Sequence, residues 1–184
     1  MINQLSDWLA RNTKGWLILV SFAVMAFCMA VLLPGAEAAI KATGASGPID
    51  LMFFPLPGQS YAVVSALGEA GRTSYRLTEL TVDVIYPLSY TFFYSLLTTF
   101  LLQRALDKNS PLQRLNVLPF GALIFDLLEN IGIVTMLSIH PAQPTALGFY
   151  TMAANGIKWI FAISSILALA FALAAFGWKK IRKK

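Results

Sequence analysis

The stretch "VLPFGALIFDLLENIGIVTMLSI" (117–139) decides the fold. It is apolar along its length and long enough to cross the ~30 Å hydrocarbon core of a bilayer as one α-helix. Three further runs of this kind predict membrane-spanning helices at about 16–33, 74–104 and 147–178. The sequence therefore predicts four transmembrane helices.

Composition supports this interpretation. Of the 184 residues, 57% are hydrophobic and 12% are charged, whereas soluble domains carry about 25% charged residues. Helices rather than strands are expected to span the membrane, because a helix satisfies its backbone hydrogen bonds within one segment. We predict an all-α four-helix transmembrane bundle that forms a single integral membrane domain over residues 1–184.

The basic residues predict how the chain is oriented. The net charge is +5, and Lys and Arg cluster before the first run, in the link 103–116 and at the C-terminus. The positive-inside rule places these segments in the cytoplasm, and therefore places 34–73 and 140–146 outside. This alternation indicates contact with membrane lipids rather than a nucleic-acid partner. We expect a multi-pass protein of the bacterial inner membrane.

The outer excursion 34–73 is expected to begin as an exposed Gly/Ala/Ser-rich loop and to continue along the membrane surface. A short interfacial helix should follow, with Ser60 as its N-cap, and a hinge at 68–71. The first run and the Ala-x-Ala pattern at 36–38 are similar to a secretory signal. We expect an uncleaved membrane helix, because the run is longer than the usual 7–15-residue signal core.

Asp126, Glu129 and Asn130 stand near the middle of the third run. An ionisable side chain at a helix centre costs about 2.5–3.5 kcal/mol on insertion, so these groups should face the bundle interior. We expect Glu129 rather than Asp126 to lie closer to the tyrosines of the second helix. Interhelical hydrogen bonding alone is the structural alternative, at about 0.6 kcal/mol per bond.

A second set of polar residues should ring an outer opening above these acids. Counting ~1.5 Å per residue from the cytoplasmic ends places Asp83 and Lys158 near the outer boundary. Pro87 should kink the second helix and leave the Asp83 carbonyl free. We expect Lys158 to bridge to Asp83 or Glu129 and to gate a pocket from outside, with the freed carbonyl as a second acceptor. Snorkelling to the interface is the alternative for this lysine.

The candidate ligand-binding residues are those with polar side chains along these helices: Arg72, Asp83, Tyr86, Tyr90, Asp126, Glu129, Asn130, Asn155 and Lys158. No catalytic residue is assigned and no cofactor is expected. Cys28 and His140 are the only cysteine and histidine, so no zinc or Cys–His set is possible. We therefore expect no metal site.

The stretches "GEAGRTSYRLTELTVDVIYPLSY" and "LPFGALIFDLLEN" resemble a group of small bacterial membrane proteins. These share a Gly-Arg…Tyr…Asp…Pro…Tyr pattern in one helix and Asp-x-x-Glu-Asn in the next. The resemblance covers about 50–175 and implies the architecture and the choice of residues, but no activity. The layout is also similar, by analogy only, to four-helix sterol-isomerase and sigma-2-receptor-type bundles, which enclose an acidic pocket for amphiphiles.

Four functions stay open from the sequence. The leading hypothesis is a pocket that binds a small amphiphile or lipid-like ligand. The second is an intramembrane enzyme with Asp126 or Glu129 as general acid/base. The third is a proton-coupled transporter, which requires a homo-oligomer because four helices are few for a transport path. The fourth is a structural or assembly protein.

Overall fold

The computed structural model describes residues 2–182, and all regular structure among them is helical. Four helices are long and apolar enough to cross a membrane. This confirms the predicted all-α four-helix architecture and a multi-pass membrane protein. The four spans are Gly15–Lys41, Gly68–Ala105, Pro111–Ile139 and Thr145–Arg182.

The first span is longer than predicted. It consists of α2 (Gly15–Phe27), a π-helical turn η1 (Cys28–Leu32) and α3 (Leu33–Lys41). The prediction that the helix ends before Pro34 and that an exposed loop begins there was wrong. Pro34 lies in the first turn of α3, directly after the wider π turn, where a missing backbone N–H is tolerated.

The second span contains one interruption, at Thr81. It joins α5 (Gly68–Leu80) to α6 (Val82–Ala105), and Thr81 has the non-helical dihedrals φ −125° and ψ −79°. The span begins at Gly68 rather than near Thr73, and the break precedes Pro87 by more than a turn. Pro87 still leaves the Asp83 carbonyl free within the helix. Asn130 Nδ2 donates to that carbonyl at 2.7 Å, so Lys158 is not its partner.

Part of the outer excursion folds into the bundle, whereas Leu51, Phe53 and Leu56 stay exposed. After a 3₁₀ turn, η2 (Ile49–Leu51), helix α4 (Pro57–Ala66) packs mainly on α8 (Thr145–Arg182). Ile49 and Asp50 are buried at 0% and 8% exposure. The predicted helix start at Ser60 was wrong. α4 begins at Pro57, because proline suits the first turn and Gln59 Oε1 accepts from the Leu56 N–H at 2.7 Å.

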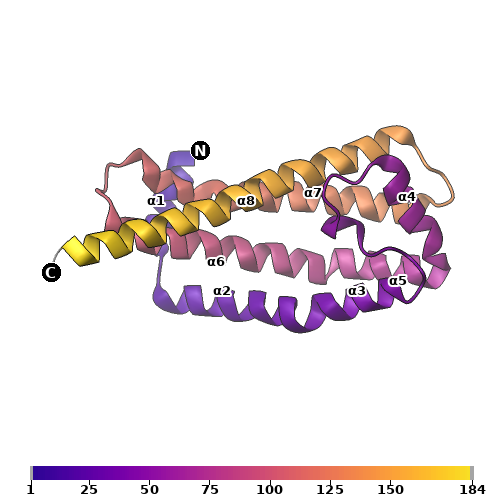
Figure 1. The fold of residues 1–184 in the computed structure, drawn as a ribbon, viewed down its shortest axis with the longest axis horizontal. Coiled ribbons are helices and arrows are strands. Elements are labelled where there is room, and N and C mark those ends of the chain that lie inside the picture. Colours follow the sequence, from indigo (N-terminus) through magenta and orange to yellow (C-terminus); the bar gives the residue numbers. More distant parts are fainter. Residues whose placement is uncertain (1, 183–184) are drawn as a thin grey trace.

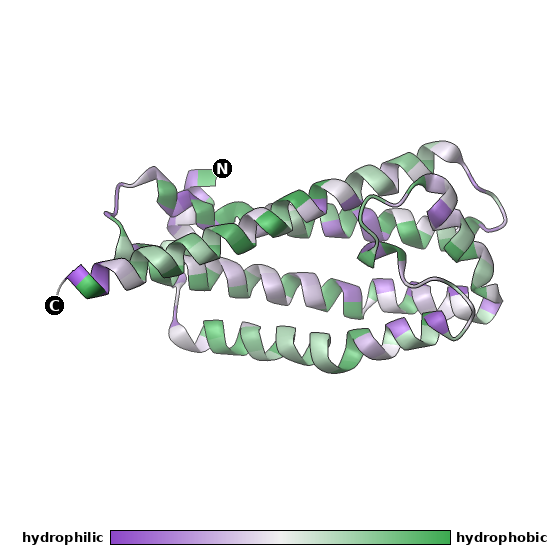
Figure 2. Cartoon of the chain, viewed as in Figure 1, coloured by the Kyte–Doolittle hydropathy of each residue, from purple (hydrophilic) through white to green (hydrophobic). Residues whose placement is uncertain are grey.

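α6, α7 (Leu118–Ile139) and α8 pack against one another, and α2 lies on the outer side of α6. Figure 1 shows α2 and α3 along one edge, α6 beside them, and α7 and α8 beyond. α7 and α8 form the most extensive pair, α6 packs on both of them, and α2 packs chiefly on α6. Figure 2 shows α2 hydrophobic along most of its length, as expected of a helix that faces lipid on several sides.

Both described chain ends and the link between α6 and α7 lie at the same end of the bundle (Figure 1). This agrees with the predicted grouping of the basic segments, and their cytoplasmic orientation stays a prediction. The sequence analysis missed α1 (Ile2–Asn12). This helix packs against the 3₁₀ segment η3 (Pro111–Val117), with Leu9 fully buried.

Two apolar clusters stabilise the ends of the bundle and leave a polar layer between them. At the excursion end, α4, α5 and α7 meet around Val64, Tyr75 and Met136. At the other end, Leu101 and Leu102 of α6 pack with Ala172 of α8. The buried charged residues of α7 and α8 lie between these clusters, so packing on both sides fixes their position.

Gly132 sets the spacing between α7 and α8 in this polar layer. A Cβ at this position would overlap Thr151 Oγ1 and contact Thr151 Cβ, which is a short β-branched side chain of α8. We expect Gly132→Ala to lower the free energy of unfolding by about 1–3 kcal/mol, because the two helices must separate. Unfolding of the purified protein in detergent micelles measures this.

The matched control is Gly177→Ala, also within a helix, where nothing lies within 4 Å of an added Cβ. This variant should gain about 0.5–1 kcal/mol from helix propensity alone. If Gly132→Ala raised the free energy of unfolding by the same amount, α7 and α8 would not approach each other as closely as described.

Candidate functional site

Lys158 of α8 lies at the centre of the polar layer. Its Nζ is 2.6 Å from Glu129 Oε2 and 3.7 Å from Asp126 Oδ1, both on α7. The lysine is 8% exposed and Glu129 is fully buried. The predicted bridge from Lys158 to Glu129 is confirmed, as is the interior position of both acids. The alternative bridge to Asp83 is not formed.

The contact between Lys158 and Glu129 places the lysine ammonium within the acidic cluster. α8 has 38 residues and is therefore about 57 Å long, nearly twice the hydrocarbon thickness, so a count from Trp178 does not fix the depth of Lys158. Its position near the outer boundary and its role as a gate stay predictions.

Asn155 lies one turn before Lys158 and connects the cluster to the outer excursion. Its Nδ2 donates to Glu129 Oε1 and to the Met52 carbonyl, both at 2.9 Å, and its Oδ1 accepts from the Phe54 N–H at 3.0 Å. Lys158 Nζ also donates to the Asp50 carbonyl at 3.1 Å. The segment 50–54 is therefore hydrogen-bonded to α8 through two side chains.

Asp126, rather than Glu129, contacts the tyrosines of α6. Tyr90 Oη donates to Asp126 Oδ2 at 2.8 Å, and the Tyr86 ring packs edge-on against Tyr90 at 5.3 Å between centroids. The prediction for Glu129 was wrong because residues three apart on a helix differ by ~60° in direction. Asp126 is directed toward α6, whereas Glu129 is directed toward α8.

Asn130 and Arg72, two of the predicted ligand-binding residues, donate hydrogen bonds to backbone carbonyls. Asn130 is buried and holds α7 against the α5–α6 junction, because its Nδ2 donates to the Asp83 carbonyl and, at 3.4 Å, to the Glu79 carbonyl. Arg72 donates to the Val64 carbonyl at 3.5 Å and contacts none of the buried acids by an ion pair among residues 2–182. Arg72 thus lies outside the cluster.

Three further buried residues lie near the cluster: Asp50, Tyr75 and Glu79. Tyr75 Oη donates to Asp50 Oδ1 at 2.8 Å and accepts from the Ile49 N–H at 2.7 Å. The only sequence signal for Asp50 is its place within the apolar stretch "PIDLMFF". That pattern also suits a surface loop, so the inward fold of the excursion was not predictable from it.

A cavity of about 290 Å³ lies beside the cluster. Its apolar lining residues come from two helices that are far apart in the sequence. Met25, Met29 and Leu33 belong to the first span, and Ala162 and Ile166 belong to α8. α2 and α8 flank it without packing extensively on each other. The remaining wall carries the polar groups of Asp50, Asp83, Tyr86, Tyr90, Tyr94, Asp126, Lys158 and Trp159.

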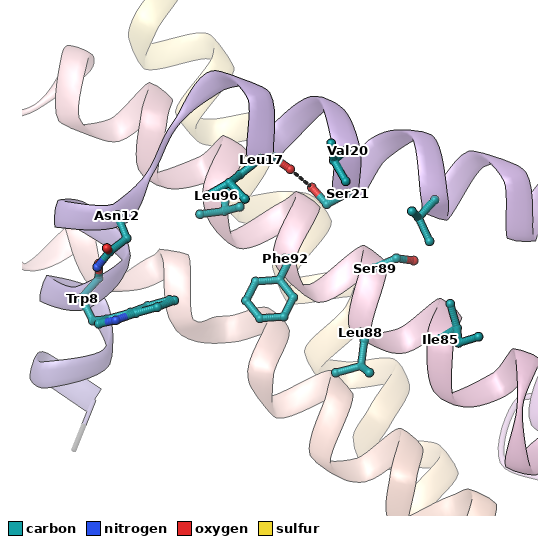
Figure 3. A pocket seen from close by; sticks show the side chains of 11 residues that line it. Trp8, Asn12, Leu17, Val20, Ser21, Ile85, Leu88, Ser89, Phe92 and Leu96 are labelled. Carbon is teal, nitrogen blue, oxygen red and sulfur yellow. Dashed lines mark hydrogen bonds between the residues drawn. The ribbon is translucent and has the colours of Figure 1, made fainter.

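A larger cavity of about 420 Å³ lies between α1, α2 and α6 (Figure 3). Its lining is apolar apart from Asn12, Ser21 and Ser89, and each of these side chains donates to a carbonyl of its own helix. Figure 3 shows this for Ser21 and Leu17. The lining of this cavity includes no titratable group.

No family model, curated protein or solved structure matches this chain. The resemblance to small bacterial membrane proteins therefore stays a prediction. The function has to be inferred from the polar layer and the cavity beside it.

Proposed function

We propose that this membrane protein binds a small amphiphile, with its polar end at the Asp126–Tyr90–Lys158 group and its apolar chain between the first span and α8. The observation that carries the proposal is the 290 Å³ cavity, whose wall combines apolar side chains with several buried polar groups. Ligand sites are commonly apolar clefts with a few convergent polar groups. The proposed access route is lateral, from the lipid phase between α2 and α8.

The polar wall favours a neutral or cationic head group over an anionic one. Five buried carboxyl groups lie in and around the polar layer, whereas Lys158 is the one buried cationic side chain among residues 2–182. Lys158 is already engaged by Glu129 and Asp126. The Trp159 Nε1–H is buried without a hydrogen-bond partner and belongs to a residue of the cavity wall. A hydroxyl or an uncharged amine can accept from this donor and donate to a carboxylate, whereas an ammonium group donates only, to the carboxylates.

A blocking substitution tests the proposal. Ala162→Trp should reduce binding of a radiolabelled long-chain amine by about tenfold or more, because the indole fills the apolar part of the cavity. The matched control, Ala170→Trp, places the same side chain on an exposed position of α8 and should bind as the parent does. Binding is measured on protein in lipid nanodiscs, with the alcohol and carboxylic acid of equal chain length as competitors.

The competitors test the head group. The alcohol should compete and the carboxylic acid should compete at least about tenfold less well, since like charges disfavour it by more than 1.4 kcal/mol. Equal binding by parent and Ala162→Trp protein would contradict the proposed site. Stronger competition by the acid would contradict the proposed ligand class.

A second candidate is an intramembrane enzyme, which is supported by the titratable groups that share this one cavity. Asp126 lies between the Tyr90 hydroxyl and the Lys158 ammonium, an arrangement suited to a general acid/base. The test is to recover the bound amphiphile after incubation with each protein. A chemical change with the parent protein, and none with Asp126→Asn protein, would favour this candidate. The transporter and assembly hypotheses have no comparable support in the cavity.

A further inference from the structure

A second acidic group lies next to the amphiphile cavity. Asp50 of η2, Glu79 of α5 and Asp83 of α6 each direct one carboxyl oxygen to within 4.8 Å of the other two. Their exposed fractions are 8%, 1% and 5%. Three segments separated in sequence thus bring three buried carboxyl groups to one point.

The oxygens of this group are largely without partners. Both carboxyl oxygens of Glu79, and Oδ2 of Asp83, are buried and accept no hydrogen bond. The single hydroxyl proton of Tyr75 is donated to Asp50. A buried carboxyl group without a partner is strongly unfavourable, and native structures therefore rarely leave one unpaired.

The three carboxyl groups line a small cavity of about 60 Å³. This is far below the ~300–1,000 Å³ of typical small-molecule pockets, so the space suits an ion with its waters rather than an organic ligand. Glu37 of α3 also lines the cavity, with a side chain that is 36% exposed and forms an ion pair with Lys41. The cation site proposed below therefore consists of the three buried carboxyl groups and does not include Glu37.

The charges in this group are not compensated by the protein. Lys158 forms its ion pairs with Asp126 and Glu129, and no ion pair reaches Asp50, Glu79 or Asp83 within residues 2–182. Either protons or a further cation must therefore offset the cost of burying three carboxyl groups.

We propose that Asp50, Glu79 and Asp83 bind one hard divalent cation of the Ca²⁺ or Mg²⁺ type. Carboxylate oxygens are the ligands that these cations prefer, with waters completing the coordination. Neither Cys28 nor His140 belongs to the group, so the site has no sulfur or imidazole ligand that would favour a softer metal. Such a cation would fix the excursion to α5 and α6, and the proposal does not depend on an amphiphile.

The test uses the full chain, purified in detergent and stripped with a chelator, with Ca²⁺, Mg²⁺ and Mn²⁺ as separate probes. Equilibrium dialysis should find one bound cation per chain, and the melting temperature should rise with cation concentration because binding favours the folded state. No saturable binding, at concentrations up to the millimolar range typical of weak Ca²⁺ sites, would overturn the proposal and indicate that protons alone neutralise the group.

Glu79→Gln and Asp83→Asn remove one ligand charge each with little change in shape. Each should weaken binding by about tenfold or more, since affinity depends on the number of charged ligands. Glu69→Gln, on the exposed side of the same helix α5, is the control and should bind as the parent does. Unchanged affinity in both site variants would place the cation elsewhere and overturn the proposal.

A measurement on the unmodified chain keeps the proposal testable if these variants do not fold. Fe²⁺ can replace Ca²⁺ or Mg²⁺ as a probe. In the presence of ascorbate and peroxide it cleaves the backbone next to the site where it is bound. Mass spectrometry should then find cuts near 50 and 79–83, and Mg²⁺ should suppress them. Cleavage confined to other segments would overturn the proposal.

Discussion

Lys158→Met is expected to lower the free energy of unfolding by about 3–5 kcal/mol, because it leaves a buried acid without its cation. The lysine is 8% exposed and lies 2.6 Å from the fully buried Glu129. It also donates to the Asp50 carbonyl, so the substitution loosens the excursion as well. Reversible unfolding in detergent micelles measures the loss. The control, Lys180→Met near the end of the same helix, removes an exposed charge and should change stability by less than about 0.5 kcal/mol.

The double variant Lys158→Met/Glu129→Gln separates the charge from the shape of the side chain. Removal of both charges should recover much of the loss, since replacing a whole buried pair is often nearly neutral. If the double variant were as strongly destabilised as Lys158→Met, the loss of stability would come from packing rather than from the ion pair. A single variant as stable as the parent would contradict the buried position of Lys158.

Asn155→Leu is the second substitution with a large expected effect. The amide is fully buried and bonds Glu129, the Met52 carbonyl and the Phe54 N–H. Leucine has the same branched arrangement of heavy atoms but no polar group, so it leaves these three groups unpaired, at about 1–3 kcal/mol for each buried polar group. We therefore expect a loss of about 3 kcal/mol or more in the free energy of unfolding.

A local measurement distinguishes this loss from general destabilisation. The Phe54 amide should exchange its hydrogen at least about tenfold faster in the variant, because its acceptor is gone and the local opening becomes easier. The exchange rates of amides in the middle of α6 should rise only by the amount that the loss of global stability explains. Asn109→Leu, in the exposed link between α6 and α7, is the control and should leave the Phe54 amide protected. Protection of Phe54 in Asn155→Leu protein would contradict the contact.

The number of spans and the interior position of Asp126 and Glu129 could be predicted from the amino-acid sequence alone. Both follow from the cost of placing a group in hydrocarbon, which depends on the residue and its immediate neighbours. The same reasoning predicted that Lys158 meets an acid, since a cation among intramembrane acids is stabilised by pairing with one of them, but it left Asp83 and Glu129 open as partners. The structure forms the bridge to Glu129. The ligand-binding role of these residues stays a prediction.

Only the tertiary structure decided which groups meet across the bundle. Phe54 and Asn155 are 101 residues apart, and Asp50 joins Glu79 and Asp83 only because the excursion folds inward. No local pattern distinguishes a loop on the membrane surface from one that enters the bundle, since both suit the same apolar and aromatic residues. The choice depends on long-range partners such as Asn155, Lys158 and Tyr75, whose relative positions are fixed by packing between helices.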